Sequence, residues 1–364
     1  MALRCGIVGL PNVGKSTLFN ALTEAGIAAE NYPFCTIEPN SGIVPVPDER
    51  LAGLDGVVHA KQVIPATVEF TDIAGLVRGA SKGEGLGNQF LANIRETAAV
   101  IHVVRCFEDE DVTHVEGSID PLRDVETIET ELGLADIDTV EKRFDRAQRA
   151  AKAGRKEDKD EAAFLEGLLA HLSEGNPARS FEVPVEQARI YRESFLLTGK
   201  PVLYVANVDE AGLTDGNDVV LALEAHAKKV GAGCVRICAK VESELAELSD
   251  EERQEFLEDL GLEEPGLHRL IRAAYALLNL ITYLTAGEKE VRAWTVHQGA
   301  SAPEAAGEIH TDFERTFIRA EVIPYTEYIA CNGEIGAKAQ GKMRAEGKDY
   351  IVQDGDVILF RVGA

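Results

Sequence analysis

Short apolar runs recur along most of the chain and are separated by longer stretches of mixed polarity. Residues 5–8 and, apart from His102, residues 98–104 form apolar runs, as buried parallel strands do, and residues 67–71 alternate with β-branched side chains. Two further predicted strands, at 201–206 and 234–238, lead into Asn207 and Ala239. Strands that alternate with helices predict an α/β fold, a doubly wound sheet whose ligand lies beyond the strand carboxyl ends.

A different pattern begins at Pro121, where a long charged stretch replaces the alternation of strands and helices. The spacing predicts one helix over residues 122–152 and a second over about 158–173, with Gly154 interrupting them. We therefore expect a helical hairpin, spanning about residues 122–196, inserted ahead of the strand at 201–206.

The pattern changes again near Leu280. Short segments there predict a small α+β unit with strands at 290–296, 320–323, 349–352 and 357–362, a helix at 302–310 and an Asp-Gly turn at 353–356. The unit carries no catalytic constellation, which favours a structural or partner-binding appendage. The predicted division is a nucleotide domain at 1–279, containing the hairpin, and a second domain at 280–364.

Composition agrees with a globular chain of more than one domain. The 364 residues are 45 % hydrophobic and 27 % charged, and no apolar run approaches the ~18 residues of a membrane span. The first residues run straight into a strand pattern without a signal peptide, and the six cysteines are scattered. We therefore expect a cytoplasmic protein with no membrane association.

Charge limits the possible contacts with nucleic acid to one segment. The formal net charge of −25 opposes binding of a polyanion by the surface as a whole. Residues 142–159, at the hairpin junction, are the exception, with eight basic residues against three acidic ones. Two interpretations stay open: a solvated helical face, which is the commoner origin of charge runs, or a contact for RNA.

The most informative motif is Gly-Leu-Pro-Asn-Val-Gly-Lys-Ser-Thr at residues 9–17, between the first apolar run and a helical pattern. A strand, a glycine-rich loop and a helix in this order form a phosphate-binding P-loop. Lys15 is predicted to reach the β- and γ-phosphates, and the Ser16 hydroxyl to bind Mg²⁺. Asp72 ends a predicted strand and Gly75 follows it, which is the place for a second Mg²⁺-directed acid and a γ-phosphate-sensing turn.

Taken together, the motifs resemble those of the Obg-related YchF family of P-loop NTPases. The matching segments are the P-loop, Pro-Phe-Cys-Thr-Ile-Glu-Pro-Asn at 33–40, Asp-Ile-Ala-Gly-Leu-Val-Arg-Gly-Ala at 72–80, the helical insertion before Asn207, and a C-terminal segment similar to TGS domains. The resemblance covers essentially the whole chain. It implies a G domain interrupted by a coiled coil, a β-grasp TGS domain, and a ribosome-associated NTPase that prefers ATP or accepts both purines.

The resemblance also implies roles for single residues. Thr36 is expected to join Ser16 on Mg²⁺, Asp72 to hold the metal through water, and the Gly75 N–H to contact the γ-phosphate. Asn207 is expected to read the base edge, and residues 238–240 match the family's further base-contacting loop only in part. The remaining expected nucleotide contacts come from the P-loop and the base motif: Asn12, Val13, Gly14, Thr17, Val208 and Glu210.

The base motif predicts that ATP binds at least as well as GTP. Guanine-specific relatives carry Asn-Lys-x-Asp, whereas residues 207–210 read Asn-Val-Asp-Glu. Glu210 displaces the carboxylate by about 1.5 Å, one C–C bond, and Val208 removes the lysine stem. The Asn207 amide could instead pair with the 6-amino group and N7 of adenine.

The residue that positions the attacking water is not obvious, because Leu76 stands where Ras-like switches carry glutamine. One candidate is His114, in an acidic segment, although a solvent-exposed histidine held by its acidic neighbours explains the residue equally well. The other is a K⁺ ion held partly by Asn12, as in related potassium-stimulated GTPases.

Two functional classes fit the P-loop. The first is a hydrolytic switch whose nucleotide state is reported to the ribosome or ribosomal RNA through the basic hairpin and the TGS domain. The second is a P-loop phosphotransferase acting on a small metabolite. The Asp72–Gly75 turn and the base motif favour the switch. Labelled ATP distinguishes the two, because a switch releases free phosphate and a kinase labels an organic acceptor.

Overall fold

The structure is a computed structural model that describes residues 4–25, 40–73, 75, 86–109 and 118–363. It divides into two compact units. The first comprises residues 1–42 and 69–270, and the second comprises residues 43–68 and 271–364. Among the described residues no helix is long and apolar enough to cross a membrane.

A six-stranded sheet with the strand order β2-β4-β1-β5-β6-β7 forms the centre of the first unit. Its strands are β1 (Arg4–Val8), β2 (Ser41–Pro45), β4 (Thr67–Asp72), β5 (Ala99–Arg105), β6 (Val202–Asn207) and β7 (Gly233–Ile237). From β4 to β7 all neighbours are parallel, so their carboxyl ends share one edge. The predicted doubly wound α/β class is confirmed, and β5 is buried along its whole length, as its apolar run predicts.

Helices connect these strands. They are α1 (Lys15–Ala25), α3 (Leu86–Glu96), α7 (Asp218–Lys229), α8 (Ala239–Glu247), α9 (Asp250–Asp259) and α10 (Gly266–Leu277), of which the last crosses into the second unit. Helices α1 and α8 pack against each other, and both begin at the edge where parallel strands end. Their N-termini therefore offer backbone N–H groups at that edge.

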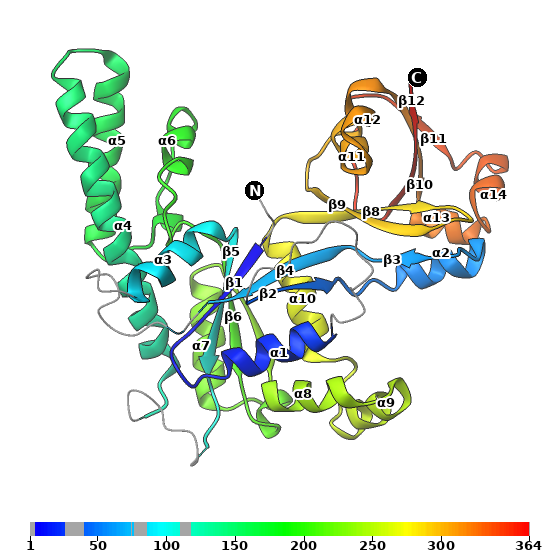
Figure 1. Cartoon of the computed structure of the whole chain (residues 1–364), viewed down its shortest axis with the longest axis horizontal. Coiled ribbons are helices and arrows are strands. Elements are labelled where there is room, and N and C mark those ends of the chain that lie inside the picture. Colours follow the sequence, from blue (N-terminus) through cyan, green and yellow to red (C-terminus); the bar gives the residue numbers. More distant parts are fainter. Residues whose placement is uncertain (1–3, 26–39, 74, 76–85, 110–117, 364) are drawn as a thin grey trace. The chain divides into compact units, whose positions relative to one another are not determined.

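The helical hairpin is present as predicted. Helix α4 (Pro121–Ala151) carries proline in its first turn and an Asp120 cap, and α5 (Lys156–Ser173) runs back beside it (Figure 1). Gly154 has a φ of +89°, the left-handed conformation that ends α4 and turns the chain. A short helix, α6 (Ala188–Arg192), precedes β6.

One buried carboxylate fixes the root of the hairpin. Asp136 of α4 is fully buried and accepts hydrogen bonds from the Leu197 N–H, at 2.8 Å, and from the Thr198 N–H and hydroxyl, at 2.8 and 2.7 Å. These donors lie in the segment that leads into β6. The hairpin is thus joined to the central sheet by buried polar contacts as well as by the chain itself.

The second unit is built on a mixed sheet with the order β11-β10-β12-β8-β9-β3. Its strands are β3 (Val63–Ile64), β8 (Leu280–Ala286), β9 (Val291–His297), β10 (Phe317–Pro324), β11 (Arg344–Glu346) and β12 (Asp356–Val362). Its helices are α2 (Arg50–Val58), α11 (Ala302–Ile309), α12 (Thr311–Thr316), α13 (Tyr325–Ala330) and α14 (Glu334–Ala339). Helix α11 packs on the sheet through Ala302, Ala305 and Ala306, in keeping with the expected β-grasp arrangement.

Two details of this unit differ from the sequence analysis. Residues 349–352 form no strand; Ile351 makes only an isolated bridge to Ser301, and the Asp-Gly turn instead leads into β12. Residues 43–68, which the sequence analysis left within the nucleotide domain, cluster with the C-terminal residues. Strand β3 pairs with β9, and Arg50 of α2 forms an ion pair with Asp354 at 2.7 Å.

Candidate functional site

The loop between β1 and α1 has the backbone shape of an anion-binding P-loop. Asn12 and Gly14 have φ values of +62° and +92°. Left-handed residues this close together turn backbone N–H groups toward one point, where the positive end of α1 is also directed. Glycine is required at position 14, because an added Cβ would lie 2.2 Å from Asn207 Nδ2.

Lys15 lies inside this loop. Its side chain is 7 % exposed, and its Nζ donates a hydrogen bond to the Leu10 carbonyl oxygen at 2.8 Å. Burial lowers the pKa of Lys15, while the charge of Asp72 acts to raise it. A Cβ on Gly75 would lie 3.1 Å from Lys15 Nζ, so the structure brings these two predicted residues together.

Ser16 and Asp72, two of the three residues predicted to bind Mg²⁺, also meet. Ser16 Oγ donates to Asp72 Oδ2 at 3.3 Å, and the Asp72 N–H donates to the Asn40 carbonyl oxygen at 2.8 Å. Asp72 Oδ1 is buried and has no hydrogen-bond partner within the described chain. A hydroxyl and a carboxylate oxygen of this kind fit Mg²⁺, which takes few protein ligands and completes its shell with phosphates and water. No cluster of three or more His, Cys, Asp or Glu side chains with metal-binding spacing occurs among the residues described.

Beside the P-loop is a cavity of about 610 Å³ at the carboxyl ends of β5, β6 and β7. Asn12, Gly14 and Thr17 line one part of it, and Asn207, Val208, Asp209 and Glu210 line another; the rest is Phe107, Glu108, Asp109, Cys238, Ala239, Lys240, Val241 and Glu244. Its size suits a nucleoside, and it adjoins the phosphate-binding loop. The predicted base motif and P-loop therefore border one cavity.

The Asn207 side chain forms hydrogen bonds within the protein, whereas the sequence analysis expected it to bind the base. The side chain is 4 % exposed; Nδ2 donates to the Val13 carbonyl oxygen at 2.8 Å, and Oδ1 accepts from the Ala239 N–H at 3.0 Å. Its amide oxygen already serves the protein, so pairing the whole amide with adenine would disrupt that contact. The second Nδ2 hydrogen is the group left over for an acceptor on a base.

Comparison with known proteins gives the family. A model described as "50S ribosome-binding GTPase" matches residues 4–138, and the model of the YchF-GTPase C-terminal domain, described as a protein of unknown function, matches residues 280–363. A Haemophilus influenzae protein named "Ribosome-binding ATPase YchF" is 60 % identical over 99 % of both chains. The chain belongs to the YchF family. Proteins of the same name from Escherichia coli O157:H7 and Bacillus subtilis are 58 % and 56 % identical, each over 99 % of both chains.

The solved structures agree with this membership. The structure titled "Structure of the Schizosaccharomyces pombe YchF GTPase" matches with a TM-score of 0.89 and 37 % identity, covering 99 % of this chain and 97 % of the other. The resemblance identified from the motifs is thereby confirmed across both units of the chain.

Sequence reasoning missed the contribution of the segment after β5. Arg105 is 2 % exposed, donates to the carbonyl oxygens of Phe107 and Asp109, and places its guanidinium 4.6 Å from the Phe107 ring centroid. This buried arginine shapes one wall of the cavity, with Phe107 as its aromatic surface. An aromatic residue just beyond the carboxyl end of an apolar strand could have indicated it. In this YchF-family chain, Thr36, Leu76 and His114 lie outside the described residues.

The tight contact at Gly14 generates a prediction. Gly14→Ala should weaken ATP binding at least tenfold, because the added methyl collides with Asn207 and strains a left-handed residue. Gly154→Ala is the matched control, since Gly154 has a φ of +89° but open space around its Cβ position. It should bind ATP as the unmodified chain does. Equal affinities for all three proteins by isothermal titration calorimetry would contradict the site.

Proposed function

We propose that this chain is a Mg²⁺-dependent ATPase whose nucleotide state controls its association with the ribosome. The observation that carries the proposal is the arrangement of Lys15, Ser16 and Asp72 around a P-loop that borders a nucleoside-sized cavity. Relatives at 56–60 % identity are named ribosome-binding ATPases. A kinase acting on a small metabolite is not favoured, because those relatives carry the name of a hydrolase over their whole length. A protein that works on ribosomes belongs in the cytoplasm.

In this proposal each side chain has a stated task. Lys15 leaves the Leu10 carbonyl oxygen for the β- and γ-phosphates, which are stronger acceptors. Ser16, and Asp72 through water, would hold Mg²⁺, and the bound ion would neutralise charge on the phosphates. Thr36 would be a further Mg²⁺ ligand, and the Gly75 N–H would contact the γ-phosphate. The backbone of Val13, Gly14 and Thr17 encloses the remaining phosphate oxygens.

The base preference follows from the groups that line the cavity. Both purines offer N7, so the second Asn207 N–H does not separate adenine from guanine. Asp209 Oδ1 accepts from the Gly212 N–H at 2.9 Å, and Val208 is 2 % exposed, with its N–H bonded to the Ile237 carbonyl oxygen. Within the base motif we assign the base contact to Glu210, which lines the cavity and is one methylene longer than the aspartate of guanine-specific relatives. ATP is therefore preferred, and GTP is also accepted.

A change of the base motif tests this preference. In titrations of ATP and GTP, Glu210→Asp should shift the affinity ratio toward GTP by about tenfold, because a carboxylate pairing with guanine contributes ~1.5 to 3 kcal/mol. The double variant Val208→Lys, Glu210→Asp should shift it further, although a buried lysine at 208 also lowers stability. An unmodified chain that binds GTP tenfold more tightly than ATP would refute the proposed preference.

For the hydrolytic step we propose two candidates that position the attacking water. The side chain of leucine at position 76 cannot do so, because it can neither donate nor accept a hydrogen bond. His114 can accept a proton from water near neutral pH, and a K⁺ ion held partly by Asn12 can act as a fixed positive charge. His114→Ala should lower kcat with little change in ATP affinity, and replacing Na⁺ by K⁺ should raise kcat. An unchanged kcat would exclude the imidazole, and equal rates in the two salts would exclude the ion.

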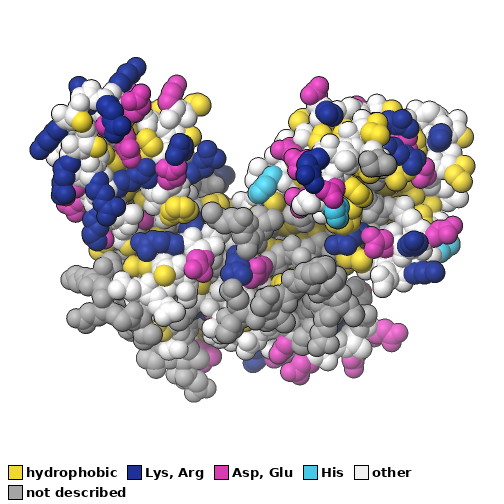
Figure 2. All heavy atoms as spheres, turned by 45° about the horizontal axis from the view of Figure 1, so that its top comes forward, with side chains coloured by type: hydrophobic (Ala, Val, Ile, Leu, Met, Phe, Trp, Pro, Cys, Tyr) yellow, Lys and Arg dark blue, Asp and Glu magenta, His cyan; other side chains and the backbone are white. Residues whose placement is uncertain are grey.

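Ribosome or ribosomal RNA association is assigned to the basic end of the hairpin, whose Lys and Arg side chains cover much of its surface in Figure 2. The exposed basic residues there, called the basic tip below, are Lys142, Arg146, Arg149, Lys152, Arg155, Lys156 and Lys159. Arg143 is not part of the basic tip, because its charge is used within the hairpin region. It forms ion pairs with Glu161 at 3.0 Å and Glu193 at 3.6 Å, and it donates to the Ile190 carbonyl oxygen. A contribution of the C-terminal unit to the same contact is part of the proposal.

Charge reversal tests the basic tip. Arg149→Glu with Lys152→Glu should weaken co-sedimentation with ribosomes, and binding by the unmodified chain should fall steeply as salt rises. Lys228→Glu with Lys229→Glu is the matched control, because both residues are exposed on α7 and the change of net charge is equal. If the two double variants sediment alike, the hairpin is a structural arm.

A further inference from the structure

The C-terminal sheet contains a split between two neighbouring parallel strands. Among the described residues, β12 and β8 are in register only at Val357 and Leu284. Beyond that point β12 stays paired with β10 on its other side as far as Val362. One edge of β12, at residues 358–362, therefore has no strand of this unit in register with it. Backbone N–H and C=O groups on such an edge can pair with an added chain.

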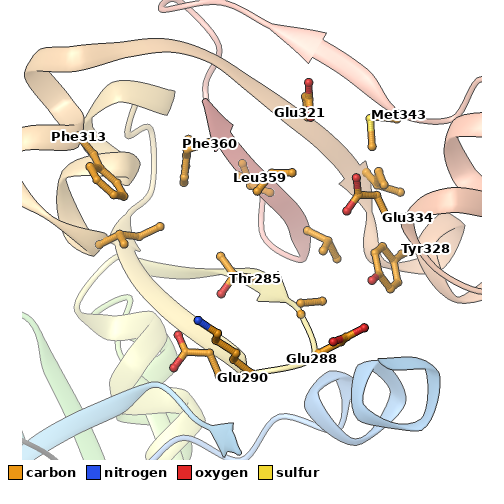
Figure 3. Close-up of a pocket in the computed structure, with 17 residues that line it drawn as sticks. Thr285, Glu288, Glu290, Phe313, Glu321, Tyr328, Glu334, Met343, Leu359 and Phe360 are labelled. Carbon is orange, nitrogen blue, oxygen red and sulfur yellow. The ribbon is translucent and has the colours of Figure 1, made fainter. Parts of the chain in front are cut away.

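A cavity of about 550 Å³ lies in this split, which we call the β8–β12 slot (Figure 3). Phe313 and Phe360 lie on one side of β12, and Tyr328, Met343 and Glu334 lie on the other. Thr285 comes from β8. Side chains of a strand alternate between the two faces of a sheet, so a space lined from both faces has the form that a missing strand leaves.

The apolar lining has an acidic border. Glu288 and Glu290, in the β8–β9 turn and just before β9, line the slot together with Glu334 and a single lysine, Lys289. Glu321 is neutralised by ion pairs to Arg319 at 2.9 Å and Arg361 at 2.8 Å. Within the described chain no ion pair involves Glu288, Glu290 or Glu334. The slot thus combines aromatic surface with three carboxylates and one lysine, and none of these three carboxylates forms an ion pair within the described chain.

We infer that the β8–β12 slot binds an extended segment of a basic polypeptide as an added strand on β12. Main-chain hydrogen bonds to residues 358–362 would supply affinity, and alternate apolar side chains would enter the two lined faces. Lysine or arginine residues of the segment would meet Glu288, Glu290 and Glu334 at the border. Carboxylates in these positions oppose RNA, because they repel its phosphates. The inference concerns a surface apart from the nucleotide site and does not depend on ATP hydrolysis.

The test uses the full chain and a fluorescein-labelled peptide, Lys-Arg-Val-Ile-Val-Lys-Arg, followed by fluorescence anisotropy. Glu288→Lys with Glu290→Lys should weaken binding by about tenfold, because two attractive contacts become repulsive. Glu251→Lys with Glu255→Lys, at exposed positions of α9, makes the same change of net charge elsewhere and should bind as the unmodified chain does. The peptide Glu-Glu-Val-Ile-Val-Glu-Glu should not bind.

Hydrogen exchange then locates the peptide. Its binding should slow exchange of amides within residues 358–362, and Leu359→Trp, which enlarges a side chain lining the slot, should abolish that protection. ATP affinity should stay unchanged in this variant, which reports that the nucleotide unit is folded. Any one of four results would overturn the inference. The peptide could fail to bind, or both glutamate-to-lysine double variants could lose binding equally. Protection could be confined to other segments, or poly(U) RNA could displace the peptide.

Discussion

The side-chain amide of Asn207 is the contact on which the nucleotide site depends. It joins the end of β6 to the P-loop through the Val13 carbonyl oxygen and to the start of α8 through the Ala239 N–H. Both polar groups are buried, so the loss of either partner would leave an unsatisfied donor or acceptor. Gly14 is needed because this amide lies so close to the loop. The P-loop and the segment proposed to bind the base are therefore held together by contacts within the chain itself.

This constraint separates the fixed contacts of the site from the contacts that a ligand can replace. Lys15 and Asp72 have groups that can bind a ligand in place of their present contacts. Lys15 donates its hydrogen bond to a backbone carbonyl oxygen, and Asp72 Oδ1 has no partner in the described chain. The Asn207 amide has only one hydrogen that is not already used in these two hydrogen bonds. Catalysis by a P-loop is largely positioning and electrostatic stabilisation, which favours a rigid frame with a few replaceable contacts.

The order of segments along the chain links the proposed metal site to the second unit. After the Thr36 segment the chain forms β2, then α2 and β3, and only afterwards β4 and Asp72. Residues 43–68, between the predicted Mg²⁺ ligands Thr36 and Asp72, fold with the C-terminal residues. The backbone that is expected to respond to the γ-phosphate is thus continuous, on both sides, with the unit that contains the β8–β12 slot.

The sequence alone predicted the features that depend on residues close together along the chain. The P-loop, the buried β5 and the hairpin turn at Gly154 follow from local apolar runs and glycine positions, and all three are present. Strand β3 was missed because it has two residues and forms only by pairing with β9, far along the chain. The partners of Asn207 were missed for the same reason: the motif gives the residue type, but the fold decides which backbone groups meet it.

The most direct measurement is a crystal structure of the chain with Mg²⁺ and a non-hydrolysable ATP analogue. The account predicts that Lys15 Nζ leaves the Leu10 carbonyl oxygen for the phosphates and that Mg²⁺ binds between Ser16 and Asp72. Asn207 should keep its bonds to Val13 and Ala239 and give its second amide hydrogen to N7 of adenine. A structure in which Asn207 leaves both partners, or in which the nucleotide lies outside the cavity beside Phe107 and Glu210, would contradict it.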